Sequence, residues 1–188
     1  MKELKGYASA TAYTETGKLP AGGYILKILN VEELTYDWGS VLKLDFDIVD
    51  GEYKDFYRRN YANQSQEDKK WKGSYRLNVP KDDGSEKDNW TMRTFKTAIQ
   101  AVEDSNSGYH WNWDEKTLVG KNVGGLFRNK EYEYDGKCGF FTECCAFRDT
   151  DTIKSGKFTV PADKLLQSNT TSTDFIPVPN VNDDDLPF

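Results

Sequence analysis

One segment constrains the fold of this chain more than any other. In SVLKLDFDIVDGEY, residues 40–53, every second residue from Leu42 to Ile48 is apolar and the residues between them are charged. Successive side chains of a strand point to opposite faces, so this period of two predicts a half-buried strand. Asp50-Gly51 then predicts a hairpin turn into a third strand over YKDFYRRNY, residues 53–61.

Three further segments are also typical of strands. Residues 20–34 predict an apolar-rich first strand, joined to the second by a turn at 35–40. Residues 118–134 and 137–148 predict a fourth and a fifth strand around the turn Asp135-Gly136. The chain therefore favours a mainly β protein.

A single helix is predicted among these strands, over residues 87–108. Met92, Phe95, Ile99 and Val102 recur at helical spacing, and Asp88 or Asn89 could cap the start. The order of three strands, a helix and two strands is that of the OB-fold, a five-stranded Greek-key barrel with one helix between strands 3 and 4. Gly124-Gly125 suits the sharp bend that a small barrel needs. An open α+β sheet is the alternative with the same order.

Composition divides the chain into three parts. We predict a folded body over residues 1–161, a flexible linker rich in Ser, Thr and Asn over 162–182, and a disordered acidic tip over 183–188. From residue 162 onward the chain carries five aspartates and one lysine, so the net charge of −6 leaves only −2 on the body. A nearly neutral body is compatible with a locally basic binding groove.

The small numbers of histidines and cysteines limit the catalytic and metal-binding sites that this chain can form. There is one histidine, and the three cysteines form neither a CxxC pair nor an even set, which favours reduced thiols in a cytoplasm. No apolar run is long enough to span a membrane. We find no catalytic motif, and we expect no catalytic residue, no metal site and no cofactor. Asp45 with Asp47, on one predicted strand face, is the one carboxylate pair considered as a metal site.

Basic and aromatic residues interleave in two regions and in the first hairpin loop. Cations that follow phosphates and rings that stack on unpaired bases are the means by which proteins hold single-stranded nucleic acid. The candidate DNA-binding residues are Tyr36, Trp38, Tyr57, Arg58, Arg59, Tyr61, Lys70, Trp71, Lys72, Tyr75, Arg76, Phe127, Arg128, Tyr132 and Tyr134. The alternative for each of these aromatic side chains is a position in the hydrophobic core.

The last six residues, DDDLPF, resemble the acidic tip of bacterial single-stranded DNA-binding proteins. WKGSYR, LVGKNVGGLFRNKEYEY and DTIKSGKF are similar to the phage and mobile-element members of that family. The resemblance implies an OB body, a linker and a tip that recruits host replication, recombination and repair proteins. The partner-binding residues it implies are Asp183, Asp184, Asp185, Leu186, Pro187 and Phe188.

We therefore expect a non-enzymatic protein that coats single-stranded DNA without sequence preference, with no membrane partner. Its oligomeric state stays open, and a homo-oligomer is one option. The alternatives are a metal-dependent nuclease of a phage or mobile element, and an adaptor that carries the tip without binding DNA.

Overall fold

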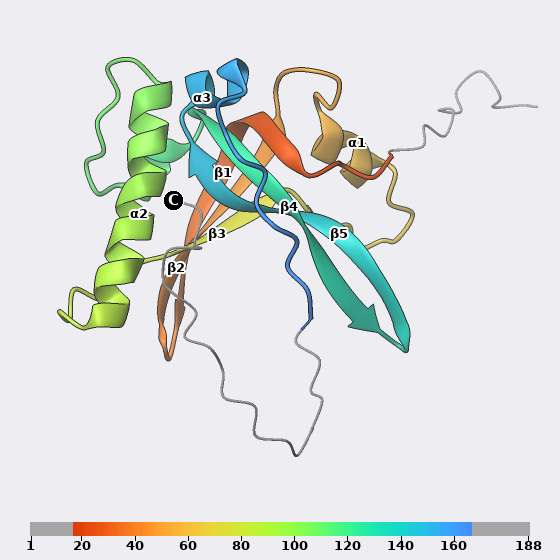
Figure 1. Ribbon diagram of the computed structural model, residues 1–188, viewed down its shortest axis with the longest axis horizontal. Coiled ribbons are helices and arrows are strands. Elements are labelled where there is room, and N and C mark those ends of the chain that lie inside the picture. Colours follow the sequence, from red (N-terminus) through yellow and green to blue (C-terminus); the bar gives the residue numbers. More distant parts are fainter. Residues whose placement is uncertain (1–16, 167–188) are drawn as a thin grey trace, which may run out of the picture.

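The structure is a computed structural model, and it describes residues 17–166. Five strands and three α-helices make up this part of the chain, together with a short 3₁₀ helix (Figure 1). In chain order the elements are β1 (Gly22–Tyr36), β2 (Gly39–Ile48), α1 (Phe56–Ala62), β3 (Ser74–Asn78), α2 (Glu86–Ser105), the 3₁₀ helix η2 (Glu115–Leu118), β4 (Asn122–Tyr134), β5 (Lys137–Arg148) and α3 (Thr150–Ser155).

The five strands form one antiparallel sheet in the order β3-β2-β1-β4-β5. The prediction of a mainly β protein with a helix between its third and fourth strands is confirmed by this sheet and by α2. The two edge strands approach each other, because the rings of Tyr75 in β3 and Phe147 in β5 lie 4.6 Å apart, centroid to centroid. The sheet is therefore curled.

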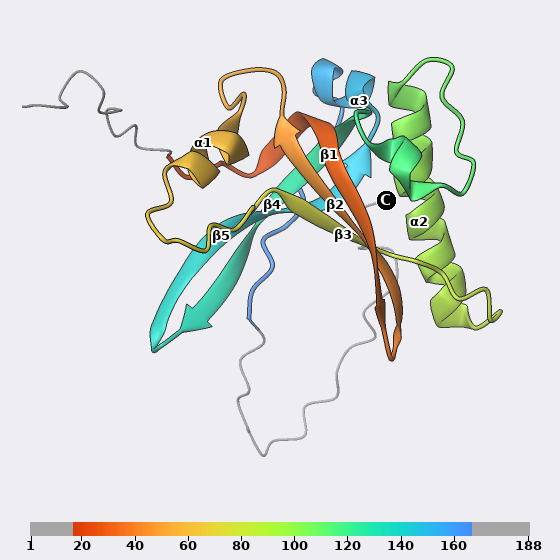
Figure 2. The ribbon, with the colours of Figure 1, turned by 180° about the vertical axis from the view of Figure 1, so that it is seen from behind.

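Two hairpins extend from the curled sheet on the same side of the molecule (Figures 1 and 2). One is the end of the β1–β2 hairpin, with Asp37 and Trp38 in its turn. The other arises because β1 pairs with β4 only as far as Phe127. Beyond that point β5 is the one strand that pairs with β4, and we call this hairpin, residues 128–143, the β4–β5 arm.

The predicted third strand over residues 53–61 is wrong, because most of this segment is helix α1. Asp47, at the end of β2 and only 2% exposed, accepts hydrogen bonds from the backbone N–H groups of Tyr57 (3.0 Å) and Arg58 (3.1 Å). These donors belong to the first turn of a helix and need an acceptor. The acceptor is Asp47, ten residues before Tyr57 in the chain. The alternation of the second strand had predicted that Asp47 faces solvent, whereas it is buried.

The true third strand is β3, which lies in the polar stretch between α1 and α2. Its five residues alternate, with Tyr75 and Leu77 buried and Arg76 and Asn78 exposed. A strand of five residues gives only a short alternation in the sequence, so β3 was not predicted between the polar loops.

Helix α2 matches its predicted range but not its predicted cap. Ser85 caps it, accepting a hydrogen bond from the Asp88 N–H at 3.1 Å. Asp88 instead accepts from the backbone N–H of Lys81 and holds the preceding loop. One face of α2 packs on the sheet through Phe95, Ile99 and Val102.

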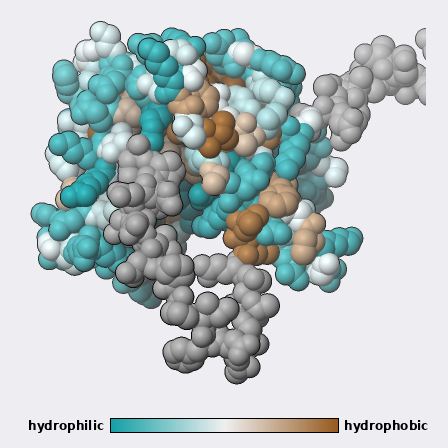
Figure 3. Space-filling view, in the orientation of Figure 1, coloured by the Kyte–Doolittle hydropathy of each residue, from teal (hydrophilic) through white to brown (hydrophobic). Residues whose placement is uncertain are grey.

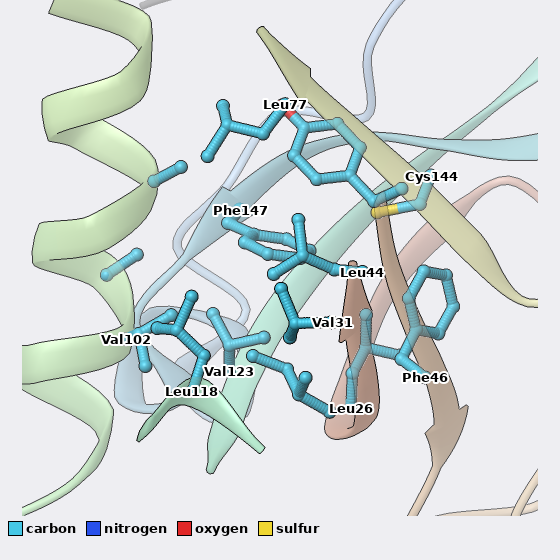
Figure 4. Packing of buried hydrophobic residues seen from close by; sticks show 14 of the residues in the cluster. Leu26, Val31, Leu44, Phe46, Leu77, Val102, Leu118, Val123, Cys144 and Phe147 are labelled. Atoms are coloured by element: carbon cyan, nitrogen blue, oxygen red, sulfur yellow. The ribbon is translucent and has the colours of Figure 1, made fainter. Parts of the chain in front are cut away.

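The core lies between α2 and the concave face of the sheet (Figure 4). Leu44 and Phe46 come from β2 and Phe147 from β5, and all three are almost wholly buried. Close packing also explains the glycines of β4: a Cβ on Gly125 would lie 2.5 Å from Leu26 Cδ1 and 2.9 Å from the Phe127 ring. The ladder shifts register just after them, between Leu126 and Phe127.

After α3 the chain returns along the free edge of β4. Lys164 donates its N–H to the Asn129 carbonyl at 2.8 Å and accepts from Glu131 N–H at 2.9 Å. The first residues of the predicted linker, 162–166, thus lie beside the β4–β5 arm, and the remainder, 167–182, lies outside the described residues. Within residues 17–166, no helix has the length and apolar character needed to span a membrane.

Candidate functional site

A groove of about 900 Å³ runs along the open seam between β3 and β5. One wall is formed by β3 and the first turns of α2, and the other by the β4–β5 arm. Helix α1 and residues 17–19 line it as well.

The groove is strongly basic. Its lining contains one carboxylate, that of Glu143, and six cations. The cations are Lys18, Lys72, Arg76, Arg128, Lys130 and Lys164. Glu143 accepts from Arg128 Nη2 at 3.0 Å and lies 3.3 Å from Lys130 Nζ. The other four cations have no ion-pair partner among residues 17–166, so their charge is free to meet an anionic ligand.

Partly exposed rings stand on both walls. Trp90, 49% exposed, lies in the first turns of α2, and Phe140 and Phe141 are on the arm. Lys18 Nζ lies 5.7 Å from the centroid of the Phe140 ring, and Lys130 Nζ lies 5.6 Å from that of Phe141. Figure 3 shows hydrophobic residues, in brown, around the arm within a mostly hydrophilic surface. A cation thus lies beside each of the two phenylalanine rings of the arm.

The floor of the groove carries groups that stay neutral. Burial raises the pKa of Tyr57 and of Tyr75, and a nearby Cys144 thiolate would raise both further. Burial also raises the pKa of the Cys144 thiol itself. At neutral pH these groups keep their protons, so the floor adds no negative charge that would repel a phosphate.

The tip of the β1–β2 hairpin carries a preformed aromatic stack. The rings of Tyr36 and Trp38 are nearly parallel, at 4°, with centroids 5.1 Å apart. Arg76, which lines the groove, donates to Tyr36 Oη at 3.3 Å and so connects the stack to the groove wall. Trp38 is 58% exposed and offers a free ring face.

Five candidate residues from the sequence line the groove: Tyr57, Lys72, Tyr75, Arg76 and Arg128. Tyr132 and Tyr134 continue along the β4–β5 arm toward its turn, where the Tyr132 ring covers Gly139. Phe127 is fully buried in the core, with 0% exposure, and has no ring face to offer a ligand. We therefore leave it out of the interface.

A second set of candidates lies on α1 and the loop after it, outside the groove lining. They are Arg58, Arg59, Tyr61, Lys70 and Trp71. Trp71 is half-buried, and its Nε1–H donates to the carbonyls of Gly73 (3.0 Å) and Phe46 (3.2 Å). These bonds give the Trp71 ring a structural role in anchoring the loop to β2.

Some groove residues were missed or undervalued in the sequence. Lys18, Trp90 and Lys164 come from three separate segments, and only the fold brings them together. Lys130, Phe140 and Phe141 belong to the basic and aromatic pattern of the last two strands. Their directly opposed register, Lys130 against Phe141, is the signal that could have identified them.

The carboxylate pair considered for a metal is engaged by the protein. Asp45 accepts from Ser74 Oγ at 2.6 Å and lies 3.3 Å from Lys43 Nζ, while Asp47 caps α1. Across the described part of the chain, no three His, Cys, Asp or Glu side chains come together as a metal-binding group.

No family profile matches the chain, and no curated protein matches its sequence. The predicted tip, Asp183 to Phe188, lies outside the described residues.

Proposed function

We propose that this protein binds single-stranded DNA without sequence preference, through the groove between β3 and β5. The observation that carries the proposal is the groove itself, with six cations, one carboxylate and partly exposed rings on both walls. Cations follow the phosphates of an unpaired strand and rings stack on its bases, and neither contact depends on sequence. Duplex DNA keeps its bases stacked inside the helix and cannot use the rings.

We infer that the body is an OB-fold. The strand order, the helix between β3 and β4 and the approach of the two edge strands support this assignment. OB-folds bind oligonucleotides on one face of the sheet between projecting loops. The groove has a comparable position, between the β1–β2 hairpin and the β4–β5 arm.

We further propose that the DDDLPF tip recruits host proteins of replication, recombination and repair, in the cytoplasm of a bacterium that carries a phage or mobile element. Phe188 supplies a ring that suits an apolar pocket on a partner protein. The three aspartates would steer the tip toward a basic surface. The sequence resemblance of the tip supports this step.

Binding of the full chain to labelled oligo-dT and to a duplex of equal length tests the main proposal. We expect tight binding to oligo-dT, much weaker binding to the duplex, and affinity that falls as salt rises. Equal affinity for the two, or no binding to oligo-dT, would reject it. Running the oligo-dT arm with magnesium also reads out cleavage, the outcome expected of a nuclease.

A further inference from the structure

A second cavity, of about 390 Å³, lies between the middle of α2 and the end of β5. We call it the α2 hollow. Its basic side chains are Arg93 and Lys96 from α2 and Arg148 from β5, and Phe147 lies in its lining. None of these residues was a candidate in the sequence.

The α2 hollow adjoins the groove along one seam between α2 and β5. Thr94 lines the groove and Thr97 lines the hollow, and three helical residues rise only about 4.5 Å. On β5, Cys145 lines the groove and Phe147 the hollow, a step of about 7 Å along the strand. A strand lying in the groove therefore needs to extend by little more than one nucleotide to reach the hollow.

The floor continues across the boundary between the two cavities. Tyr75 belongs to the groove and Phe147 to the hollow, and their rings are in contact at 4.6 Å. The side wall is also uniform, because Thr91, Thr94 and Thr97 follow one another along α2 and each donates its hydroxyl to a carbonyl four residues earlier. This wall carries no charge that would repel a phosphate.

The charges of the hollow favour an anion at its outer rim. Arg93 and Lys96 are exposed and have no acidic partner among residues 17–166. Two carboxylates also line the hollow and keep their charge, so three cations face two carboxylates there: Asp104 accepts from Gln100, another lining residue, and Asp149 caps α3 through Thr152. The bonds from Thr152 lower the pKa of Asp149, so its charge stabilises the helix start.

We propose that the α2 hollow is a second phosphate-binding subsite on the path of the same DNA strand. The strand leaves the groove along the α2–β5 seam, and its next phosphates meet Arg93, Lys96 and Arg148. This inference rests on the proposed function and adds the direction in which a bound strand runs. Long, exposed cations on a shallow hollow suit a phosphodiester backbone better than a small enclosed ligand.

The test compares two lengths of oligo-dT, about 5 and about 20 nucleotides, a range that spans typical OB-fold site sizes. The variant is Arg93→Gln with Lys96→Gln, two exposed positions whose change leaves the core intact. The matched control is Lys87→Gln, a cation in the first turn of the same helix that lines neither cavity.

For the long oligonucleotide, we expect the double variant to reduce the log–log salt slope by about 1.4, since each lost phosphate contact contributes about 0.7. The short oligonucleotide should bind the variant and the unchanged protein equally. An unchanged slope with the long oligonucleotide, equal losses at both lengths, or the same loss per charge in the Lys87 control would each overturn the subsite. Failure of the unchanged protein to bind either oligonucleotide would instead reject the proposed function, and the subsite with it.

Discussion

The rings of Tyr75 and Phe147 lie 4.6 Å apart at 44°, although their strands are the two edges of the sheet. This contact holds the curled sheet across the seam where no β-ladder joins β3 to β5 in the described residues. It also forms the common floor of the groove and the α2 hollow.

We expect Phe147→Ala to destabilise the protein by about 3–5 kcal/mol, because it leaves a cavity in the core. A double-mutant cycle with Tyr75→Leu and Phe147→Leu, measured by urea unfolding, should give a coupling of about 0.5–1.5 kcal/mol. Strictly additive effects would show that the two edges are held together by other contacts.

Alkaline pH should destabilise the fold. Burial, with smaller effects from Tyr53 and Glu52, raises the pKa of Tyr24 to about 12, whereas an unfolded tyrosine titrates near pH 10. The unfolded state therefore loses this proton first, so the stabilisation is complete below about pH 10 and is lost as pH rises toward about 12. Burial shifts the pKa of Tyr57 and Tyr75 in the same direction.

Urea unfolding at a series of pH values should show this loss. Tyr24→Phe should make the decline between about pH 10 and 12 shallower, while Tyr134→Phe, at an exposed position on the arm, serves as the control. A decline of equal steepness in both variants would mean that Tyr24 is not responsible.

The sequence predicted the strands that have long patterns and clear turns. The fifth strand, 137–148, and the Asp135-Gly136 turn match the structure because a turn sequence is a local property, and both turn residues have the positive φ that it predicts. The third strand failed because α1 depends on a cap from Asp47, a tertiary contact that local pattern does not contain. Phe56 and Tyr57, adjacent and both buried, fit a helix face better than a strand.

The sequence predicted the basic and aromatic character of the groove, but only some of the residues that line it. The basic and aromatic interleaving correctly included Arg76 and Arg128 among the groove-lining residues. It could not separate Phe127, which points into the core, from Phe141, which lies on the arm. The register shift after Leu126 changes which residues of β4 face inward, and no sequence period reveals it.

The groove cations should determine the salt dependence of DNA binding. We expect Lys72→Gln with Arg76→Gln to reduce the log–log salt slope by about 1.4, because both side chains line the groove without an ion pair. Arg58→Gln with Arg59→Gln removes the same charge from α1, outside the lining, and should change the slope much less. A larger effect from the α1 pair would move the DNA path to that helix.

Two tryptophans from the sequence prediction should now behave differently. Trp38→Ala should weaken oligo-dT binding by about 1–3 kcal/mol, because an exposed ring on a preformed stack can hold a base. Trp71→Ala should mainly lower the free energy of unfolding, since its Nε1–H anchors a loop to β2. Fluorescence titration and urea unfolding of both variants separate the two effects. The assignment is wrong if Trp38→Ala binds normally and Trp71→Ala loses affinity without losing stability.

The last prediction concerns residues 183–188, which follow a chain that leaves the described region beside the groove. Lys164 lines the groove, and Leu166 N–H donates to Glu131 on the β4–β5 arm. An acidic segment attached there competes with phosphate for the same cations at a high effective concentration. Removing 183–188 should therefore leave oligo-dT binding intact or slightly tighter, more visibly at low salt. The same truncation should abolish the pull-down of host proteins that bind such tips. Phe188→Ala keeps all three aspartates, so its failure to recruit those proteins would separate ring recognition from plain acidity. Normal recruitment by Phe188→Ala would contradict the role of the ring in partner binding. Loss of DNA binding on truncation would contradict the assignment of DNA binding to the groove.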